Sequence, residues 1–153
     1  MSRKKTADAP PLSPRAHAHV RAAFHEAGRY IAAKHFKIAQ VSGLYPLANG
    51  SQFVGKTVYE PTTPFNESVI GWAGAIMEIY FANQPDKWNV TRKTVWELFA
   101  KNQLSKSDSD LIGRHAEKRK TFAAAVKILK SNFGEIKEVA DILCRFNSVI
   151  NFP

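Results

Sequence analysis

The sequence predicts a single α+β domain over residues 14–153, mostly helical, with about five helices and one β-hairpin. Three observations indicate this class. Apolar residues recur at helical spacing after Pro14, an almost wholly apolar run follows Asn66, and two segments rich in β-forming residues flank the turn signal Ala48-Asn49-Gly50-Ser51. Because 44% of the 153 residues are hydrophobic, the chain can bury a core without disulfides or a structural metal.

The first half is predicted to contain two helices and the hairpin. Residues 1–13 hold charges and prolines but almost nothing apolar, which predicts a flexible basic arm. Ser13 suits an N-cap and Pro14 the first helical position of a helix that is expected to run to about Lys37. The hairpin pairs residues 38–47 with 52–59. Asn66 is the expected cap of a second helix ending at Phe81 or Asn83, which should be central because it is apolar all round.

The second half is predicted to be helical. We expect a short helix over residues 91–101, a long one from about Asp108 to Lys130 and a last one from Glu135 to Phe146. We expect Gly134 to separate the last two helices.

Positive charge is the main compositional signal. The formal net charge is +9, and the cationic residues are concentrated in residues 1–37 and in one later cluster: Arg114, Lys118, Arg119, Lys120, Lys127 and Lys130. Such a charge favours an acidic protein surface, a ribonucleoprotein complex or nucleic acid as partner. The later cluster is therefore the predicted partner-binding surface, and a merely solvated basic face is the alternative.

The sequence predicts a cytoplasmic protein. Its single cysteine, Cys144, cannot form an internal disulfide, which suits a reducing compartment. No apolar run approaches the length of a bilayer span, and the basic start is not followed by the apolar core of a secretory signal. We therefore expect no membrane association.

One motif indicates chemistry, and it is incomplete. In H-E-x-x-H, two histidines on one helical face bind Zn²⁺ and the glutamate activates the metal-bound water. Here the run is His25-Glu26-Ala27-Gly28-Arg29. A guanidinium has no lone pair to offer, so Arg29 cannot be a ligand. Glu26 and Arg29 are three residues apart and can instead form an ion pair. Arg29 pointing to water is the alternative.

The surroundings of this motif resemble the FtsH-type zinc metallopeptidases, the peptidase domain of AAA proteases. Residues 24–33 are similar to their helix H-E-A-G-H-A-x-x-A, and Val41-Ser42-Gly43-Leu44-Tyr45-Pro46 to the strand that follows. Trp72-Ala73-Gly74-Ala75-Ile76-Met77-Glu78 resembles their G-G-x-x-A-E helix, and Ser109-Asp110-Leu111 their N-D-L segment. The resemblance covers roughly residues 15–130.

The resemblance implies a zincin-like fold with a vestigial site. His25 matches the first zinc ligand, Glu26 the catalytic base and Asp110 the third ligand, with Asp108 as the near alternative. Arg29 departs from the pattern at the second ligand, which leaves two protein ligands where catalytic zinc sites keep three. We therefore expect no catalytic residue, no bound metal and no cofactor.

Three functions remain open. The first is a non-catalytic interaction protein, of the free-standing kind found in phages and mobile elements, that inhibits host machinery such as a CRISPR–Cas or other defence complex in the host cytoplasm. The second is a zinc metallopeptidase with an atypical site. The third is a direct nucleic-acid-binding protein, although no nucleic-acid-binding motif is evident. A homodimer formed through aromatic residues near Trp88 and Trp96 also stays open.

Overall fold

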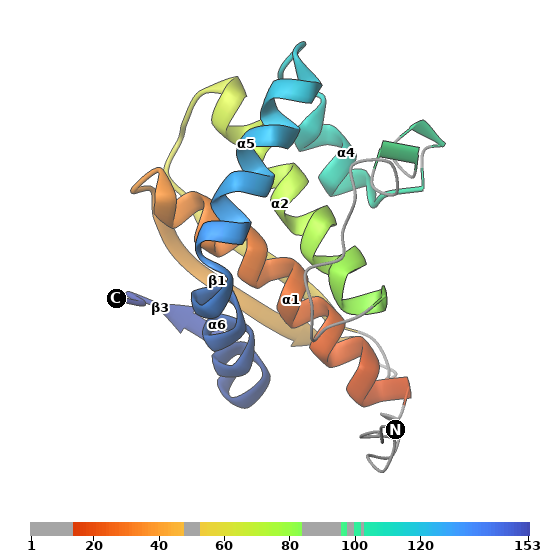
Figure 1. Cartoon of the computed structure of the whole chain (residues 1–153). Coiled ribbons are helices and arrows are strands. Elements are labelled where there is room, and N and C mark those ends of the chain that lie inside the picture. Colours follow the sequence, from red (N-terminus) through yellow and green to blue (C-terminus); the bar gives the residue numbers. More distant parts are fainter. Residues whose placement is uncertain (1–13, 48–52, 84–95, 98–99, 102) are drawn as a thin grey trace, which may run out of the picture.

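The computed structural model describes residues 14–47, 53–83, 96–97, 100–101 and 103–153. These residues form five helices and a three-stranded antiparallel sheet, which confirms the mostly helical α+β class (Figure 1). The predicted arm 1–13, the turn 48–51 and most of the predicted helix 91–101 lie outside the described residues.

The predicted hairpin is present and belongs to a larger sheet. Strand β1 (Ala39–Pro46) pairs with β2 (Phe53–Tyr59), with Leu44 opposite Gly55. A third strand, β3 (Ser148–Ile150), adds to the other edge of β1 and was not predicted. It has three residues and follows Asn147, which turns the chain in the left-handed conformation (φ 60°).

Helix α1 (Pro14–His35) packs on this sheet and against α2 (Pro64–Asn83). Its bounds agree with the prediction. Helix α2 is central, as predicted, because every residue from Ser68 to Met77 is buried. It begins earlier than predicted, because the Thr63 hydroxyl accepts the Asn66 backbone N–H at 3.2 Å and so caps a helix that starts at Pro64.

The long helix predicted from Asp108 to Lys130 is wrong: the structure has two helices, α4 (Lys106–Ile112) and α5 (Lys118–Ser131). A buried polar cluster holds the break against α2. The Ser68 hydroxyl reaches the Ile112 carbonyl at 2.9 Å and Thr121 Oγ1 at 2.8 Å, and Trp72 Nε1 donates to Thr121 at 3.1 Å. These bonds satisfy a carbonyl at the end of α4 that a continuous helix would have used itself.

Helix α6 (Phe133–Phe146) completes the domain by packing on α1 and β3. The expectation that Gly134 separates the last two helices is wrong, because Asn132 caps both and Gly134 lies inside α6. Its buried face consists of Ile136, Val139, Ala140 and Leu143. In Figure 1, α1 runs diagonally between the sheet and α2, α4 lies on the other side of α2, and α5 crosses α2 and also contacts α1. None of the described helices is long and apolar enough to cross a bilayer.

Helices α1 and α2 approach closely at two glycines. A Cβ at Gly28 would lie 2.6 Å from the Ala73 carbonyl oxygen, and one at Gly74 would lie 2.8 Å from Arg29 Nε. Real Cβ atoms do not tolerate such contacts. The glycines therefore permit the close crossing that brings His25 and Arg29 against α2.

Candidate functional site

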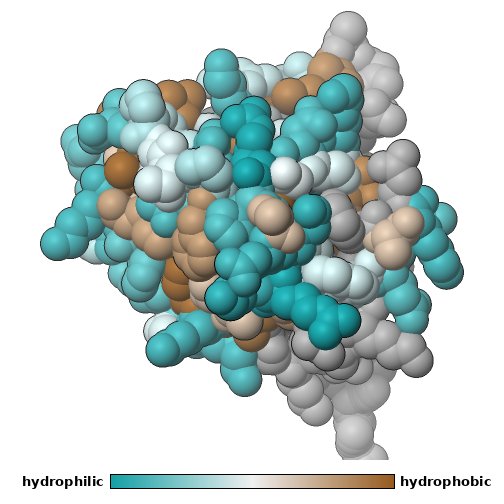
Figure 2. Space-filling model, turned by 90° about the horizontal axis from the view of Figure 1, so that it is seen from above, coloured by the Kyte–Doolittle hydropathy of each residue, from teal (hydrophilic) through white to brown (hydrophobic). Residues whose placement is uncertain are grey.

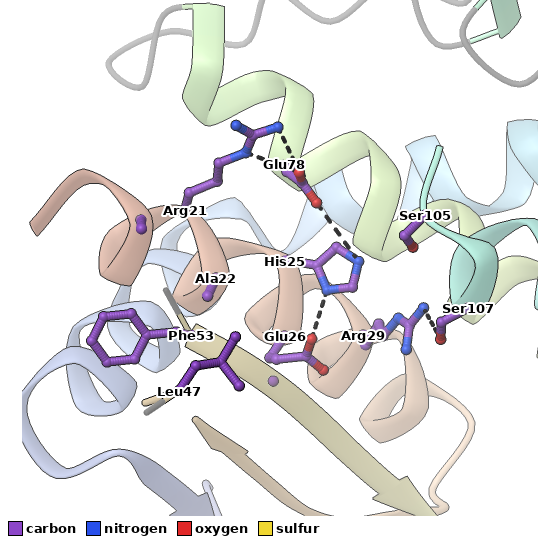
Figure 3. A pocket seen from close by; sticks show the side chains of 12 residues that line it. Arg21, Ala22, His25, Glu26, Arg29, Leu47, Phe53, Glu78, Ser105 and Ser107 are labelled. Atoms are coloured by element: carbon purple, nitrogen blue, oxygen red, sulfur yellow. Dashed lines mark hydrogen bonds and ion pairs between the residues drawn. The ribbon is translucent and has the colours of Figure 1, made fainter. Parts of the chain in front are cut away.

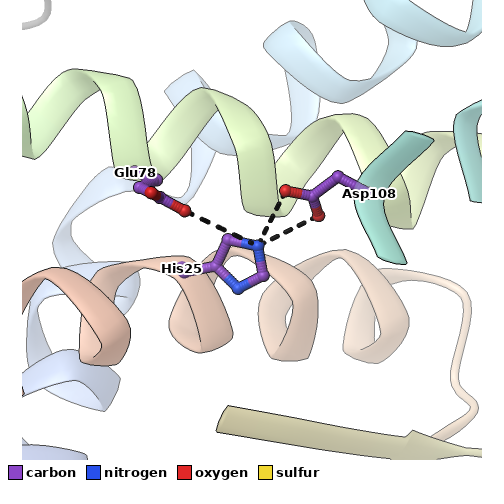
Figure 4. Close-up of side chains that lie close together, drawn as sticks. All are labelled: His25, Glu78 and Asp108. Atoms are coloured by element: carbon purple, nitrogen blue, oxygen red, sulfur yellow. Dashed lines mark hydrogen bonds and ion pairs between the residues drawn. The ribbon is translucent and has the colours of Figure 1, made fainter. Parts of the chain in front are cut away.

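Four side chains meet where α1 crosses the start of α4: His25, Glu26 and Arg29 from α1, and Asp108 from α4. We call them the Arg29 cluster. His25 Nε2 lies 2.9 and 3.0 Å from the two Asp108 oxygens, and its Nδ1 lies 2.6 Å from Glu26 Oε2 (Figures 3 and 4). The three motif residues and one aspartate are thus in direct contact.

Arg29 points into the cluster and not to water. It is 7% exposed, and its Nη2 donates to Asp108 Oδ1 at 2.5 Å and to Ser107 Oγ at 3.0 Å. Its Nε is buried without a hydrogen-bond partner among the residues described. The predicted pair of Glu26 with Arg29 is therefore replaced by a pair of Arg29 with Asp108.

Glu26 connects α1 to the sheet. Its Oε1 accepts a hydrogen bond from Thr57 Oγ1 at 2.8 Å, and Ser42 Oγ lies 2.6 Å from the same hydroxyl. The Glu26 side chain lies directly over β2, because a Cβ at Gly55 would clash with its Cγ. Glycine at position 55 therefore makes room for the buried carboxylate.

The charges of the cluster stabilise one another. Burial favours neutral His25, but the carboxylates of Asp108 and Glu26 outweigh that effect and raise its pKa to about 10. Burial would raise the pKa of Glu26 and of Asp108, yet His25 and Arg29 lower both. At neutral pH the cluster therefore holds two cations and two carboxylates, with protonated His25 donating from both nitrogens.

Asp108, and not Asp110, occupies the position facing His25. Asp108 is 1% exposed, whereas Asp110 is exposed and pairs with Lys106 at 2.8 Å. Two residues along a helix turn a side chain by about 200°, so the two aspartates of α4 cannot face the same way. Ser105 fixes the position of Asp108 by accepting its backbone N–H at 3.1 Å as the N-cap of α4.

Two further charged residues extend the cluster and were not predicted to take part in it. Arg21 pairs with Glu78 of α2 at 2.8 Å, and Glu78 Oε1 lies 3.9 Å from His25 Nε2 (Figure 3). Arg21, His25 and Arg29 are spaced by four residues, which places them on one face of α1 and was the signal available in the sequence.

Among the described residues, the group that could hold a metal ion consists of His25, Glu78 and Asp108. Their ligand atoms all lie within 4.8 Å of one another (Figure 4). One imidazole and two carboxylates suit a divalent cation. However, His25 can bind a metal only after losing its proton, and Arg29 already occupies one oxygen of Asp108.

His25, Glu26 and Arg29 of the cluster line a cavity of about 420 Å³ that continues to the inner ends of the hairpin strands, where Leu47 and Phe53 line it (Figure 3). None of the predicted partner-binding residues lines this cavity within the described ranges.

The predicted partner-binding residues follow α4 or belong to α5. Arg114 pairs with Glu67 at 3.3 Å and Lys120 with Glu117 at 2.9 Å. No ion pair is formed, in the part of the chain that is described, by the other four: Lys118, Arg119, Lys127 and Lys130.

Trp96 packs into the core. Its ring stacks on Trp72 with centroids 5.5 Å apart and meets Phe122 edge to face at 6.4 Å. This packing accounts for one of the two aromatic residues considered for a dimer face, and Trp88 lies outside the described residues.

Comparison with known proteins adds no relative. A scan against models of protein families gave no match, and a search of curated proteins found none. The resemblance to zinc metallopeptidases therefore rests on the residues quoted from the sequence.

Proposed function

We propose that this chain is a non-catalytic interaction protein built on a degenerate zinc-peptidase-like, zincin-like fold. One observation carries the proposal: the Arg29 guanidinium is buried on the carboxylate that faces His25. In the motif that the sequence resembles, position 29 would hold the second zinc-binding histidine. A permanent cation at that position supplies the positive charge that a metal would bring.

The hydrogen bonds of the cluster support the same conclusion. Both Asp108 oxygens and both His25 nitrogens are engaged by side chains of the cluster. Buried charges are stable only when such partners satisfy them. The cluster thus has the properties of a structural ion-pair network, and function must then come from the surface.

The surface favours an acidic partner. The chain has a net charge of +9, and four cations of α5 have no acidic partner among the described residues. We propose binding to an acidic protein surface or a ribonucleoprotein complex, with inhibition of a CRISPR–Cas or other defence complex by a phage or mobile-element protein as the specific form. Direct binding of nucleic acid and a homodimer are the alternatives.

The first test restores the missing ligand. Replacing Arg29 with histidine removes the cation and places a second imidazole one helical turn after His25. We expect the purified, dialysed parent to hold no stoichiometric zinc and Arg29→His to hold about one zinc per chain, as a site with three protein ligands should. Zinc in the parent would refute the proposal. Zinc in neither protein would show that the cluster has no relation to a metal site.

A zinc peptidase with an atypical site is the second candidate. It is favoured by the grouping of His25, Glu78 and Asp108 within 4.8 Å, with Glu26 beside it as a potential base. This candidate predicts one dialysis-resistant zinc in the parent and cleavage of casein that Glu26→Gln abolishes. Neither property is expected if the first proposal is right.

The partner-binding step has its own test. Tagged protein is used to capture partners from host lysate with and without nuclease, in parallel with a variant that reverses charge at Lys118, Arg119 and Lys127. We expect a nuclease-resistant partner that the variant captures weakly. Equal capture by parent and variant would show that α5 is only a solvated face, and loss on nuclease treatment would favour the nucleic-acid alternative.

A further inference from the structure

A small hollow lies beside α5 and is separate from the Arg29 cluster. It has a volume of about 320 Å³ and is formed by the end of α1, the start of α2 and one side of α5. Its apolar lining consists of Phe36, Phe65, Ala124 and Ile128, and its polar lining of His35, Lys127, Ser131 and Asn132. Seen from above, brown hydrophobic residues lie between teal hydrophilic ones on the molecular surface (Figure 2).

The size and lining of the hollow fit one large apolar side chain. Its volume is at the lower end of the roughly 300–1,000 Å³ range of ligand pockets. Ala124 contributes only a methyl group to this lining, so a larger residue at that position would take up part of the hollow. Protein interfaces commonly place an aromatic or aliphatic anchor in a pocket of this kind.

The charge beside the hollow is positive and uncompensated. Lys127 lines it and also lines a second hollow of about 480 Å³ on α5, together with Arg119 and Lys130. Within the described residues, no carboxylate lies within ion-pair distance of these three cations. Acidic groups beside an apolar anchor of a partner protein would therefore lie close to cations that have no acidic partner among the described residues. Such charge complementarity favours association with acidic partners and disfavours binding of basic ones.

Nucleic acid fits this place less well than protein. Single-stranded nucleic acids bind to exposed aromatic faces that stack on bases. Here the ring of Phe65 is contacted edge to face by His115 at 5.3 Å, and that of Phe36 by His35 at 5.2 Å. Both rings are half-buried in the wall of the hollow.

We propose that this hollow receives a large apolar side chain from an acidic segment of a partner protein, whose carboxylates pair with Lys127 and Lys130. The proposal rests on the proposed function, because it specifies where and how the interaction protein binds. It commits to a protein partner of defined chemistry: acidic overall, with one aromatic or leucine anchor.

The test selects ligands without assuming their sequence. A library of displayed random peptides is selected on the full chain, and the Kd of the most enriched peptides is measured by titration at moderate salt. We expect enriched peptides to combine an aromatic residue or leucine with several acidic residues. We further expect Ala124→Leu, which takes up part of the hollow, and Lys127→Glu, which reverses the charge, each to weaken binding about tenfold or more.

Matched controls make the outcome decisive. Lys56→Glu makes the same charge change at an exposed lysine of β2 and should leave binding within about threefold, because rim charges away from an interface contribute little. Circular dichroism and thermal melting establish that each variant folds. Methyl signals of Ala124 and Ile128 should shift on peptide addition to the parent.

Three results would overturn the proposal: no enriched peptides, peptides that bind Ala124→Leu and Lys127→Glu as tightly as the parent, or displacement by a random single-stranded oligonucleotide. The proposed function can fail separately. A partner captured from lysate equally by the parent and by Ala124→Leu would refute the hollow and leave the interaction function intact, whereas zinc in the parent would refute the function first.

Discussion

At the scale of single residues, Arg29 sets the charge balance of the site. Its guanidinium and protonated His25 face the two carboxylates of Asp108 and Glu26, and all four groups are largely buried. Removing one member of a buried network leaves its partner without compensation, which costs more than an exposed ion pair contributes. The stability of the chain should therefore depend on Arg29.

We predict that Arg29→Met lowers the free energy of unfolding by about 3 kcal/mol, because Asp108 loses one of its two cations. Urea denaturation of the two proteins measures the difference. Lys106→Ala is the control: it removes an exposed pair with Asp110 on the same short helix and should cost no more than about 0.5 kcal/mol. Similar losses in the two variants would mean that Arg29 is no more important than a surface cation.

His25 should make stability depend on pH in a defined range. Its pKa is raised to about 10, so the folded state holds a proton that the unfolded chain releases near pH 6.5. The stabilisation is complete below about pH 6.5 and is lost as pH rises toward 10, at no more than about 1.4 kcal/mol per pH unit. Below about pH 4 the sign reverses, because Glu26 and Asp108 have lowered pKa values and must be protonated.

The measurement is a series of urea unfolding curves between pH 5 and pH 10 on the parent and on His25→Gln. We expect the parent's advantage over the variant to shrink steadily above pH 6.5. An advantage that stays constant over this range would show that His25 is neutral in the folded state.

At the scale of elements, the crossing of α1 and α2 depends on Gly28. Alanine is the better helix former by roughly 1 kcal/mol, so propensity alone would make Gly28→Ala stabilising. The new methyl group would lie 2.6 Å from the Ala73 carbonyl oxygen and 2.7 Å from Met77 Cγ. Because the first neighbour is backbone, the helices must separate, and overpacking of this kind costs about 1–3 kcal/mol.

We therefore predict that Gly28→Ala destabilises the protein and disturbs the Arg29 cluster, measured as a lower melting temperature and a reduced pH dependence above pH 6.5. Gly134→Ala in α6 is the matched control, since nothing lies within 4 Å of its Cβ position. That change should be neutral or stabilising by up to about 1 kcal/mol. A stable Gly28→Ala would show that the two helices can separate without cost.

Elements with a strong local signal were predictable from the sequence, and those fixed by tertiary contacts were not. The bounds of α1 follow from its periodicity and its start at Pro14. The break between α4 and α5 escaped detection because Leu111 and Phe122 are eleven residues apart, about three helical turns, so the apolar pattern continues across it. Strand β3 is too short to show alternation, and its pairing with β1 is set by the packing of α6.

The candidate site, like the fold, was predicted only in part from the sequence. The motif placed His25, Glu26 and Arg29 on one helix, and the structure agrees. The choice between Asp108 and Asp110 depended on where α4 begins. Ser105 is its N-cap, and Asp108 is the residue three positions after that cap. Glu78 and Thr57 could not be assigned, because their contacts depend on how α2 and β2 lie against α1.

At the scale of the whole molecule, the charges are divided between a balanced interior cluster and an unbalanced surface. The Arg29 cluster, with His25 protonated, is neutral at pH 7, so the excess positive charge of the chain comes from elsewhere, including lysines of α5 that have no acidic partner among the described residues. Excess charge of one sign destabilises a compact state through self-repulsion, and salt screens exposed charges much more than buried ones.

We predict that the melting temperature rises by a few degrees between about 0.01 and 0.3 M NaCl, since the Debye length falls over this range from about 30 Å to less than 10 Å. The surface ion pairs that salt weakens are few among the described residues, and each contributes little. Reversing the charge of Lys127 and Lys130 should reduce the rise, because it lowers the net charge by four without touching the buried cluster. A melting temperature that falls with salt would mean that surface pairs outweigh self-repulsion. Repulsion among the cations of α5 that have no acidic partner in the described residues would then be too weak to set the salt dependence of the free protein.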